Sequence, residues 1–144
     1  MKNIFSIFLT SLTLFSFYHT TVSAKNSYFE EGKKLFDNKK YEESKFYFEK
    51  DIVFNPRSEN SYLYLAKIFK EEKKRDLEEN NLTTVLLLNP KNEEAIYLLT
   101  MLNIKNSNFS KAKELINTLN SVCKTMCSSK AELQSKLESS LKSE

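Results

Sequence analysis

Apolar side chains recur three to four residues apart through most of this chain, which is the spacing of one face of an α-helix. One such face is formed by Tyr62, Leu65, Ala66 and Phe69. Almost no segment alternates between apolar and polar residues as a half-buried strand would. The sequence also has only one Gly and two Pro, so it holds few residues that interrupt helices. The pattern therefore predicts an all-α protein.

A second pattern is a repeat whose period is the distance between Pro56 and Pro90. Each proline is preceded by an aromatic, a small residue and two bulky residues at matching offsets. These are Tyr28, Gly32, Leu35 and Phe48 before Pro56, and Tyr62, Ala66, Phe69 and Leu82 before Pro90. The next frame falls on Ile96, Thr100, Asn103 and Ile116. This order, at a period of about 34 residues, resembles the tetratricopeptide repeat. A plain helical bundle is the alternative, but it would not require the repeat.

The resemblance implies a right-handed α-solenoid of about three helix pairs followed by a C-terminal capping helix. The expected repeats span 25–58, 59–92 and 93–126, and the capping segment spans 127–144. Gly32 costs a helix about 1 kcal/mol relative to Ala. The resemblance explains it as a point of close helix contact. In the second repeat, Arg75 and Glu78 depart from the pattern and are spaced to pair on one helix face.

The C-terminal segment shows the features of a helix that covers the end of a stack. Ser129 and Glu132 have the spacing of a capping box. Leu133, Leu137 and Leu141 form one apolar stripe on an otherwise polar helix. We therefore expect this stripe to pack on the last repeat.

The segment 1–24 has the form of a secretory signal peptide. Lys2 precedes an apolar run from Ile4 to Tyr18, and the small residues Ser23 and Ala24 end it. The run is shorter than the about 20 residues that span a bilayer. We expect cleavage after Ala24, export to a bacterial periplasm and no membrane span in the mature chain. An uncleaved anchor is the alternative.

Charge and composition argue against several functional classes. The net charge of +3 falls to +2 when Lys2 is removed, which is too small to indicate nucleic-acid binding. The single histidine also lies in the signal segment. The mature chain then lacks the commonest general base and the commonest metal ligand. With no glycine-rich phosphate loop either, we expect neither an enzyme nor a cofactor.

The two cysteines, Cys123 and Cys127, are the one chemically distinctive feature. In an exported protein such a pair is expected to form a disulfide. Residues four apart on an intact helix are too far apart for this bridge, so the helix should end at this point. Two alternatives remain: exchanging thiols, and a Cu(I) site in which Met126 contributes a third sulfur.

By the convention of the family, the binding face comprises four positions in each repeat, mostly on the first helix. The residues there are Asn26, Phe29, Lys33, Phe36, Asn60, Leu63, Lys67, Lys70, Glu94, Tyr97, Met101 and Ile104. Aromatic and aliphatic side chains with lysines between them suit a peptide that carries acidic groups. The resemblance thus implies a non-catalytic adaptor that binds a protein or peptide. The alternatives are a thiol or copper handler and a self-associating structural subunit.

Overall fold

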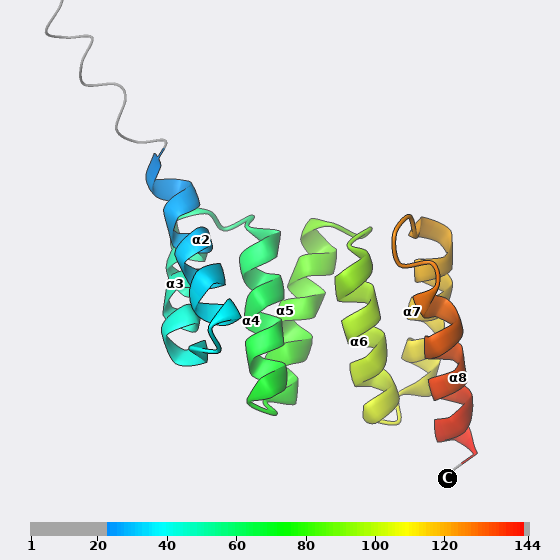
Figure 1. The fold of residues 1–144 in the computed structure, drawn as a ribbon. Coiled ribbons are helices and arrows are strands. Elements are labelled where there is room, and N and C mark those ends of the chain that lie inside the picture. The colour runs from blue at the N-terminus through cyan, green and yellow to red at the C-terminus, as the bar shows by residue number, and fades with distance from the viewer. Residues whose placement is uncertain (1–22, 143–144) are drawn as a thin grey trace, which may run out of the picture. The chain divides into compact units, whose positions relative to one another are not determined.

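The computed structural model describes residues 23–142, and Figure 1 shows this part of the chain as paired helices without strands. The helices are α2 (Ser23–Asp37), α3 (Tyr41–Phe54), α4 (Glu59–Glu71), α5 (Arg75–Leu88), α6 (Glu93–Lys105), α7 (Phe109–Val122) and α8 (Ser129–Leu141). The predicted all-α class is confirmed. Most of the predicted signal segment, residues 1–22, lies outside the described residues.

The chain divides into two compact units at the junction between Asn55 and Pro56. The first unit contains α2 and α3, and the second contains α4 to α8. Each unit is described by itself below. None of the helices in residues 23–142 has both the length and the apolar character needed to cross a bilayer.

In the first unit, α2 packs against α3 around Gly32. A Cβ atom on Gly32 would lie 2.8 Å from Cε1 of Phe48, whose side chain is fully buried. The Ser44 hydroxyl donates to the carbonyl oxygen of Gly32 at 2.8 Å. The expected close helix contact at Gly32 is therefore confirmed, because any larger residue would meet the Phe48 ring.

The turns inside the three helix pairs repeat the same backbone geometry. Lys39, Lys73 and Ser107 occupy the same position in successive repeats, and they have positive φ angles of 59°, 59° and 56°. In each turn, the next residue's N–H donates to a carbonyl five residues back, as Lys40 does to Leu35 at 2.9 Å. This closes the end of the first helix and reverses the chain direction. The period of the repeat is thus present in the backbone as well as in the side chains.

In the second unit, α4 pairs with α5 and α6 with α7, while α5 packs against α6. The aliphatic core runs through all five helices and includes Leu82, Ile96, Ala112, Leu119 and Leu133, each fully buried. Helix α8 contacts both α6 and α7. It therefore covers the apolar side of the last helix pair, as its sequence predicts.

Two expectations about α8 are wrong. Leu133 and Leu137 are buried, but Leu141 is 52% exposed because the helix ends at that residue. The capping box is also absent. Ser128 occupies the N-cap position without a side-chain cap, and the Glu132 carboxylate accepts a hydrogen bond from the Tyr97 hydroxyl at 3.1 Å. A tertiary contact has replaced the local one.

Candidate functional site

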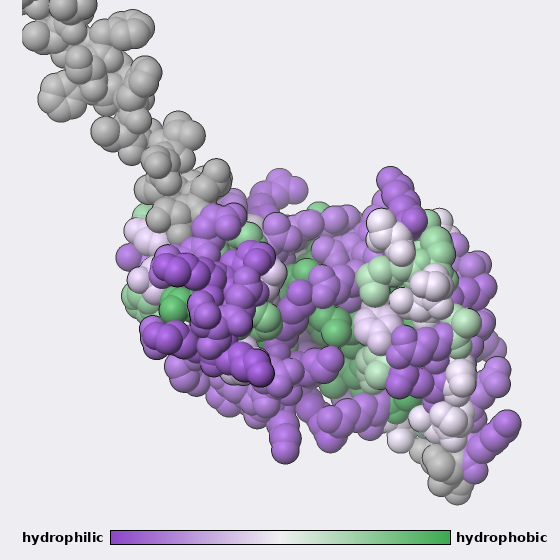
Figure 2. All heavy atoms as spheres, in the orientation of Figure 1, coloured by the Kyte–Doolittle hydropathy of each residue, from purple (hydrophilic) through white to green (hydrophobic). Residues whose placement is uncertain are grey.

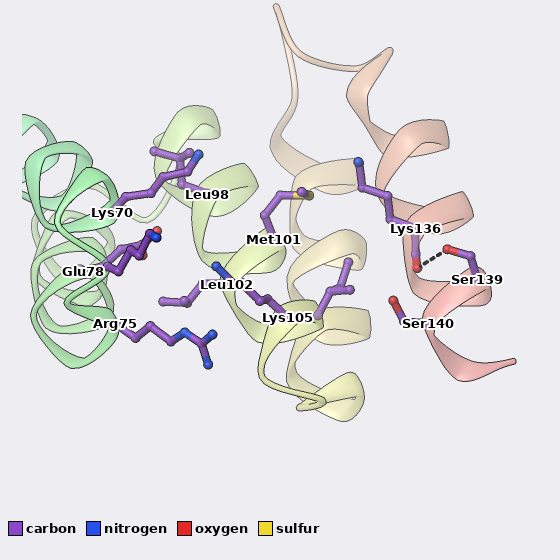
Figure 3. Close-up of a pocket in the computed structure, with 12 residues that line it drawn as sticks. Lys70, Arg75, Glu78, Leu98, Met101, Leu102, Lys105, Lys136, Ser139 and Ser140 are labelled. Carbon is purple, nitrogen blue, oxygen red and sulfur yellow. Dashed lines mark hydrogen bonds between the residues drawn. The ribbon is translucent and has the colours of Figure 1, made fainter. Parts of the chain in front are cut away.

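A pocket of about 440 Å³ lies in the second unit, between helices α4, α5, α6 and α8. Figure 3 shows the side chains of α4 and α5 on one side and those of α8 on the other, with α6 between them. The lining residues are Lys70, Lys73, Arg75, Glu78, Leu98, Met101, Leu102, Ile104, Lys105, Lys136, Ser139 and Ser140. We call this cavity the basic pocket.

The basic pocket combines an apolar floor with a cationic rim. Leu98, Met101, Leu102 and Ile104 of α6 supply the floor, while five lysine and arginine side chains surround it. One carboxylate, that of Glu78, lines the pocket together with these five cations. On the face drawn in Figure 2, hydrophobic side chains likewise come to the surface beside α6, among hydrophilic ones. Such a pocket favours a ligand with both apolar and negatively charged groups.

Glu78 is the buried acid of the basic pocket, with only 6% of its surface exposed. Burial raises the pKa of its carboxyl group, and the nearby charges of Lys70, Lys105 and Arg75 lower it by smaller amounts. The Arg75 guanidinium also donates to Oδ1 of Asn106 at 3.3 Å. Glu78 therefore lies in the position that an acidic group of a ligand would also favour.

A second pocket of about 480 Å³ lies at the start of α6 and extends to the loop that follows α7. Its lining residues are Lys91, Asn92, Glu93, Glu94, Tyr97, Leu98, Thr125 and Met126. Leu98 belongs to both pockets, so they lie next to each other along α6.

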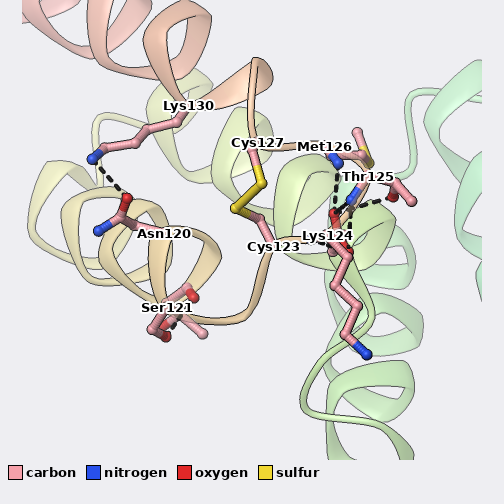
Figure 4. The surroundings of a disulfide bond; sticks show 10 residues. Asn120, Ser121, Cys123, Lys124, Thr125, Met126, Cys127 and Lys130 are labelled. Atoms are coloured by element: carbon pink, nitrogen blue, oxygen red, sulfur yellow. Dashed lines mark hydrogen bonds between the residues drawn. A yellow bond between two sulfur atoms is a disulfide. The ribbon is translucent and has the colours of Figure 1, made fainter.

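The loop after α7 is closed by a disulfide between Cys123 and Cys127, whose Cα atoms are 5.3 Å apart (Figure 4). Helix α7 ends at Val122, so Cys123 already has extended backbone and Cys127 lies before the start of α8. The helix thus ends at the cysteine pair. An intact helix would have kept the two sulfur atoms apart.

The Glu93 carboxylate anchors this loop to the start of α6. It accepts backbone hydrogen bonds from Lys124 at 2.8 Å, Thr125 at 3.0 Å and Met126 at 2.6 Å. These bonds, the one from Met126 above all, lower the pKa of Glu93. The disulfide and the carboxylate together define the conformation of the segment that joins α7 to α8.

The structure brings together part of the predicted binding face. Lys70, Met101 and Ile104 line the basic pocket, and Glu94 and Tyr97 line the second pocket. Three others of this unit, Asn60, Leu63 and Lys67, line neither pocket.

Two of those three residues have other roles in the unit. Leu63 is a core residue with 5% of its surface exposed. The Lys67 ammonium group pairs with the Glu94 carboxylate at 2.7 Å and lies 4.5 Å from the centre of the Tyr64 ring.

The remaining four residues of the predicted face belong to the first unit. The ring of Phe29 packs against Phe48 with centroids 5.8 Å apart, and that of Phe36 lies 5.5 Å from Tyr41. Lys33 pairs with Asp37 at 2.7 Å. The side chain of Asn26 lies outside the described residues. A role for these residues in binding stays a prediction.

Several residues of the basic pocket are missing from the predicted face. Lys73 lies in the turn after α4, and Lys105 is the last residue of α6; both helices are the first of their repeat. A search for basic residues near the C-terminal ends of these helices would have found both lysines. Lys136, Ser139 and Ser140 lie on α8, which has no counterpart in the repeat. Their place in the site follows only from how α8 docks.

Comparisons with known proteins identify the fold. No protein-family model matches the sequence, and no curated protein matches it. Among solved structures, the chain is similar to the type III secretion chaperone SycD of Yersinia enterocolitica in complex with a peptide of the translocator YopD. The TM-score is 0.74 at 14% identity, over 88% of this chain and 99% of that one.

Two further structures are the first tetratricopeptide domain of Spaghetti (RPAP3), bound to the HSP90 peptide SRMEEVD, and the tetratricopeptide domain of Arabidopsis OM64. For RPAP3 the TM-score is 0.72 at 17% identity, over 85% of this chain and 97% of that one. For OM64 the TM-score is 0.73 at 15% identity, over 81% of this chain and 96% of that one. The chain therefore has the tetratricopeptide-repeat fold that its period indicates.

Proposed function

We propose that this protein is a non-catalytic adaptor that binds an acidic, partly apolar segment of another protein in the basic pocket. The observation that carries the proposal is the composition of that pocket. Five cationic side chains surround an apolar floor in a cavity of about 440 Å³, with a single buried carboxylate among them. Ligand binding alone explains these side chains, and no catalytic role has to be assigned to them.

The neighbours in fold support a peptide as the ligand. The RPAP3 domain is bound to an HSP90 peptide whose sequence, SRMEEVD, contains three acidic residues. SycD is in complex with a peptide of the translocator YopD. Both proteins share the helix-pair architecture with this chain, so peptide binding is a use that the architecture permits.

The charge of the pocket defines the class of peptide. Lysine and arginine side chains form strong hydrogen bonds with carboxylates, and their attraction is larger beside an apolar floor than in open water. Leu98, Met101 and Ile104 offer a surface for aliphatic or aromatic side chains. We expect glutamate or aspartate next to leucine, isoleucine or phenylalanine in the bound segment.

The proposal includes export and cleavage of the segment 1–24, on the sequence evidence given above. In an oxidising compartment the Cys123–Cys127 disulfide would persist. The bridge occupies the two thiols that a copper site would need.

The proposal can be tested by fluorescence anisotropy with a labelled peptide in which glutamates alternate with leucines. Replacing Lys70 and Lys105 together by Ala should weaken binding about ten-fold, which corresponds to about 1.4 kcal/mol. Replacing Lys111 and Lys113 together by Ala is the matched control, because these two exposed lysines of α7 line neither pocket.

A second peptide, with glutamines in place of the glutamates, separates charge from hydrophobic contact. It should bind more weakly than the acidic peptide, and the difference should shrink at high salt. Equal binding of both peptides, or equal effects of the pocket and control variants, would reject the basic pocket as the site.

A further inference from the structure

Helix α3 carries an exposed apolar stripe on the side facing away from its core contacts. Phe46 is 58% exposed, Val53 is 74% exposed and Phe54 is 60% exposed. On a helix with about 3.6 residues per turn, Phe46, Lys50 and Val53 fall within about 60° of one another. The buried residues Ser44 and Phe48 point in the opposite direction.

This stripe differs from the scattered exposed residues found on most proteins. Large apolar side chains and Lys50 follow one another along two turns, and the Lys50 ammonium group lies 4.4 Å from the centre of the Tyr28 ring. The Phe46 ring stands edge-on to the Tyr47 ring at 5.5 Å. Exposed apolar side chains bordered by charged ones, here Glu42, Glu43 and Glu49, have the arrangement of an interface with an apolar core and a polar rim.

The order of residues along the stripe is self-complementary. A two-fold axis that crosses α3 between Glu49 and Lys50 would lay the helix antiparallel against a copy of itself. Phe46 and Val53 lie equally far on either side of this axis, so Phe46 of each copy would contact Val53 of the other copy. Glu49 of one copy would face Lys50 of the other, twice.

Other arrangements lack this match. A parallel pair of helices would place Lys50 against Lys50 and Glu49 against Glu49, which is unfavourable.

We infer that α3 is a self-association surface on which two copies of this chain pair antiparallel through Phe46, Lys50 and Val53. A contact along one helix of this length is smaller than a standard interface, which buries about 1,600 Å². The dimer is therefore weak and forms at high micromolar concentration. None of these residues lines the basic pocket, so this inference stands independently of the proposed function.

Sedimentation equilibrium of the protein isolated from cells tests the inference. The weight-average mass should rise toward twice the monomer mass as the concentration increases from about 10 µM to about 1 mM, the range of weak complexes. Val53→Glu should remove this increase. Leu87→Glu is the matched control, because Leu87 is 82% exposed and occupies the same position as Val53 in the next repeat.

A charge exchange distinguishes the antiparallel pairing from nonspecific contact. Glu49→Lys and Lys50→Glu should each weaken the dimer at least three-fold, and the double variant should restore it, since the two charges then face each other again. Circular dichroism should show unchanged helix content in all variants.

Three results would overturn the inference. One is a monomer at every concentration, another is an equal effect of Val53→Glu and Leu87→Glu, and the third is a double variant as weak as the single ones. Unchanged peptide binding by Val53→Glu would show at the same time that the two surfaces are independent.

Discussion

Replacing Gly32 by Ala tests whether the close contact in the first unit governs its stability. The change adds one methyl group to α2. At the ideal position, that methyl would lie 2.8 Å from Cε1, 2.9 Å from Cδ1 and 3.2 Å from Cζ of Phe48. These atoms form one edge of a ring that is fully buried.

One favourable and two unfavourable effects set the change in the free energy of unfolding. Ala favours the helical backbone over Gly by about 1 kcal/mol. Overpacking of a buried contact costs about 1–3 kcal/mol. If α2 shifts to relieve the contact, the 2.8 Å bond from Ser44 to the Gly32 carbonyl lengthens, and a weakened bond of this kind costs about 1 kcal/mol more. The unfavourable terms are larger, so we expect the variant to be less stable by about 1–3 kcal/mol.

Urea denaturation followed by far-UV circular dichroism measures this difference. Phe48→Leu, alone and combined with Gly32→Ala, provides the control. The smaller side chain should make room for the methyl, so that the double variant is more stable than the sum of the two single effects predicts. A Gly32→Ala protein as stable as the original, or more stable, would show that the contact is not tight and would refute the reasoning.

Four further outcomes are expected. Thermal denaturation between about pH 6 and pH 3 should show stability lost as the pH falls below 4.5, the ordinary value for Glu93, because its pKa is lowered in the fold; Glu93→Gln should remove this component. Reduction of the Cys123–Cys127 bridge with a dithiol should lower the melting temperature by a few degrees and first accelerate amide exchange beyond the bridge, since a loop this short contributes at most about 2 kcal/mol. Glu78→Gln should increase the affinity for the acidic peptide in the anisotropy assay by a few fold, because the competing carboxylate is removed. Ser107→Gly should raise the free energy of unfolding by about 0.5–1 kcal/mol, because its φ of 56° favours glycine.

The repeat could be predicted from the sequence because each helix pair buries the same positions. Phe48 and Leu82, which occupy equivalent positions in the first and second repeats, are both fully buried. Periodic burial leaves a periodic pattern in the residues, and Gly32 adds a point where only the smallest residue fits. The end of α7 was also predictable, since a bridge between Cys123 and Cys127 is incompatible with a continuous helix.

The predicted binding face was less complete, because burial and pocket lining depend on neighbouring helices. Leu63 occupies a face position of the repeat but is buried in the core. Lys105 does not occupy a face position, yet it lines the basic pocket. A rule that assigns roles by repeat position therefore includes a core residue in the binding face and omits a residue that lines the pocket.

The amino-acid sequence by itself determined the helical class, the period of the repeat, the tight contact at Gly32 and the place where α7 ends. All four depend on interactions between residues that are near in the chain or related by the repeat. Only the tertiary structure decided that Lys136 of α8 joins Lys70 and Lys105 around one apolar floor, and that Glu132 accepts a bond from Tyr97 in place of capping its own helix. These contacts join residues that lie far apart in the sequence. The leucine stripe predicts that α8 packs on the last repeat, but which side chains meet depends on the angle and register of that packing, which no local pattern encodes.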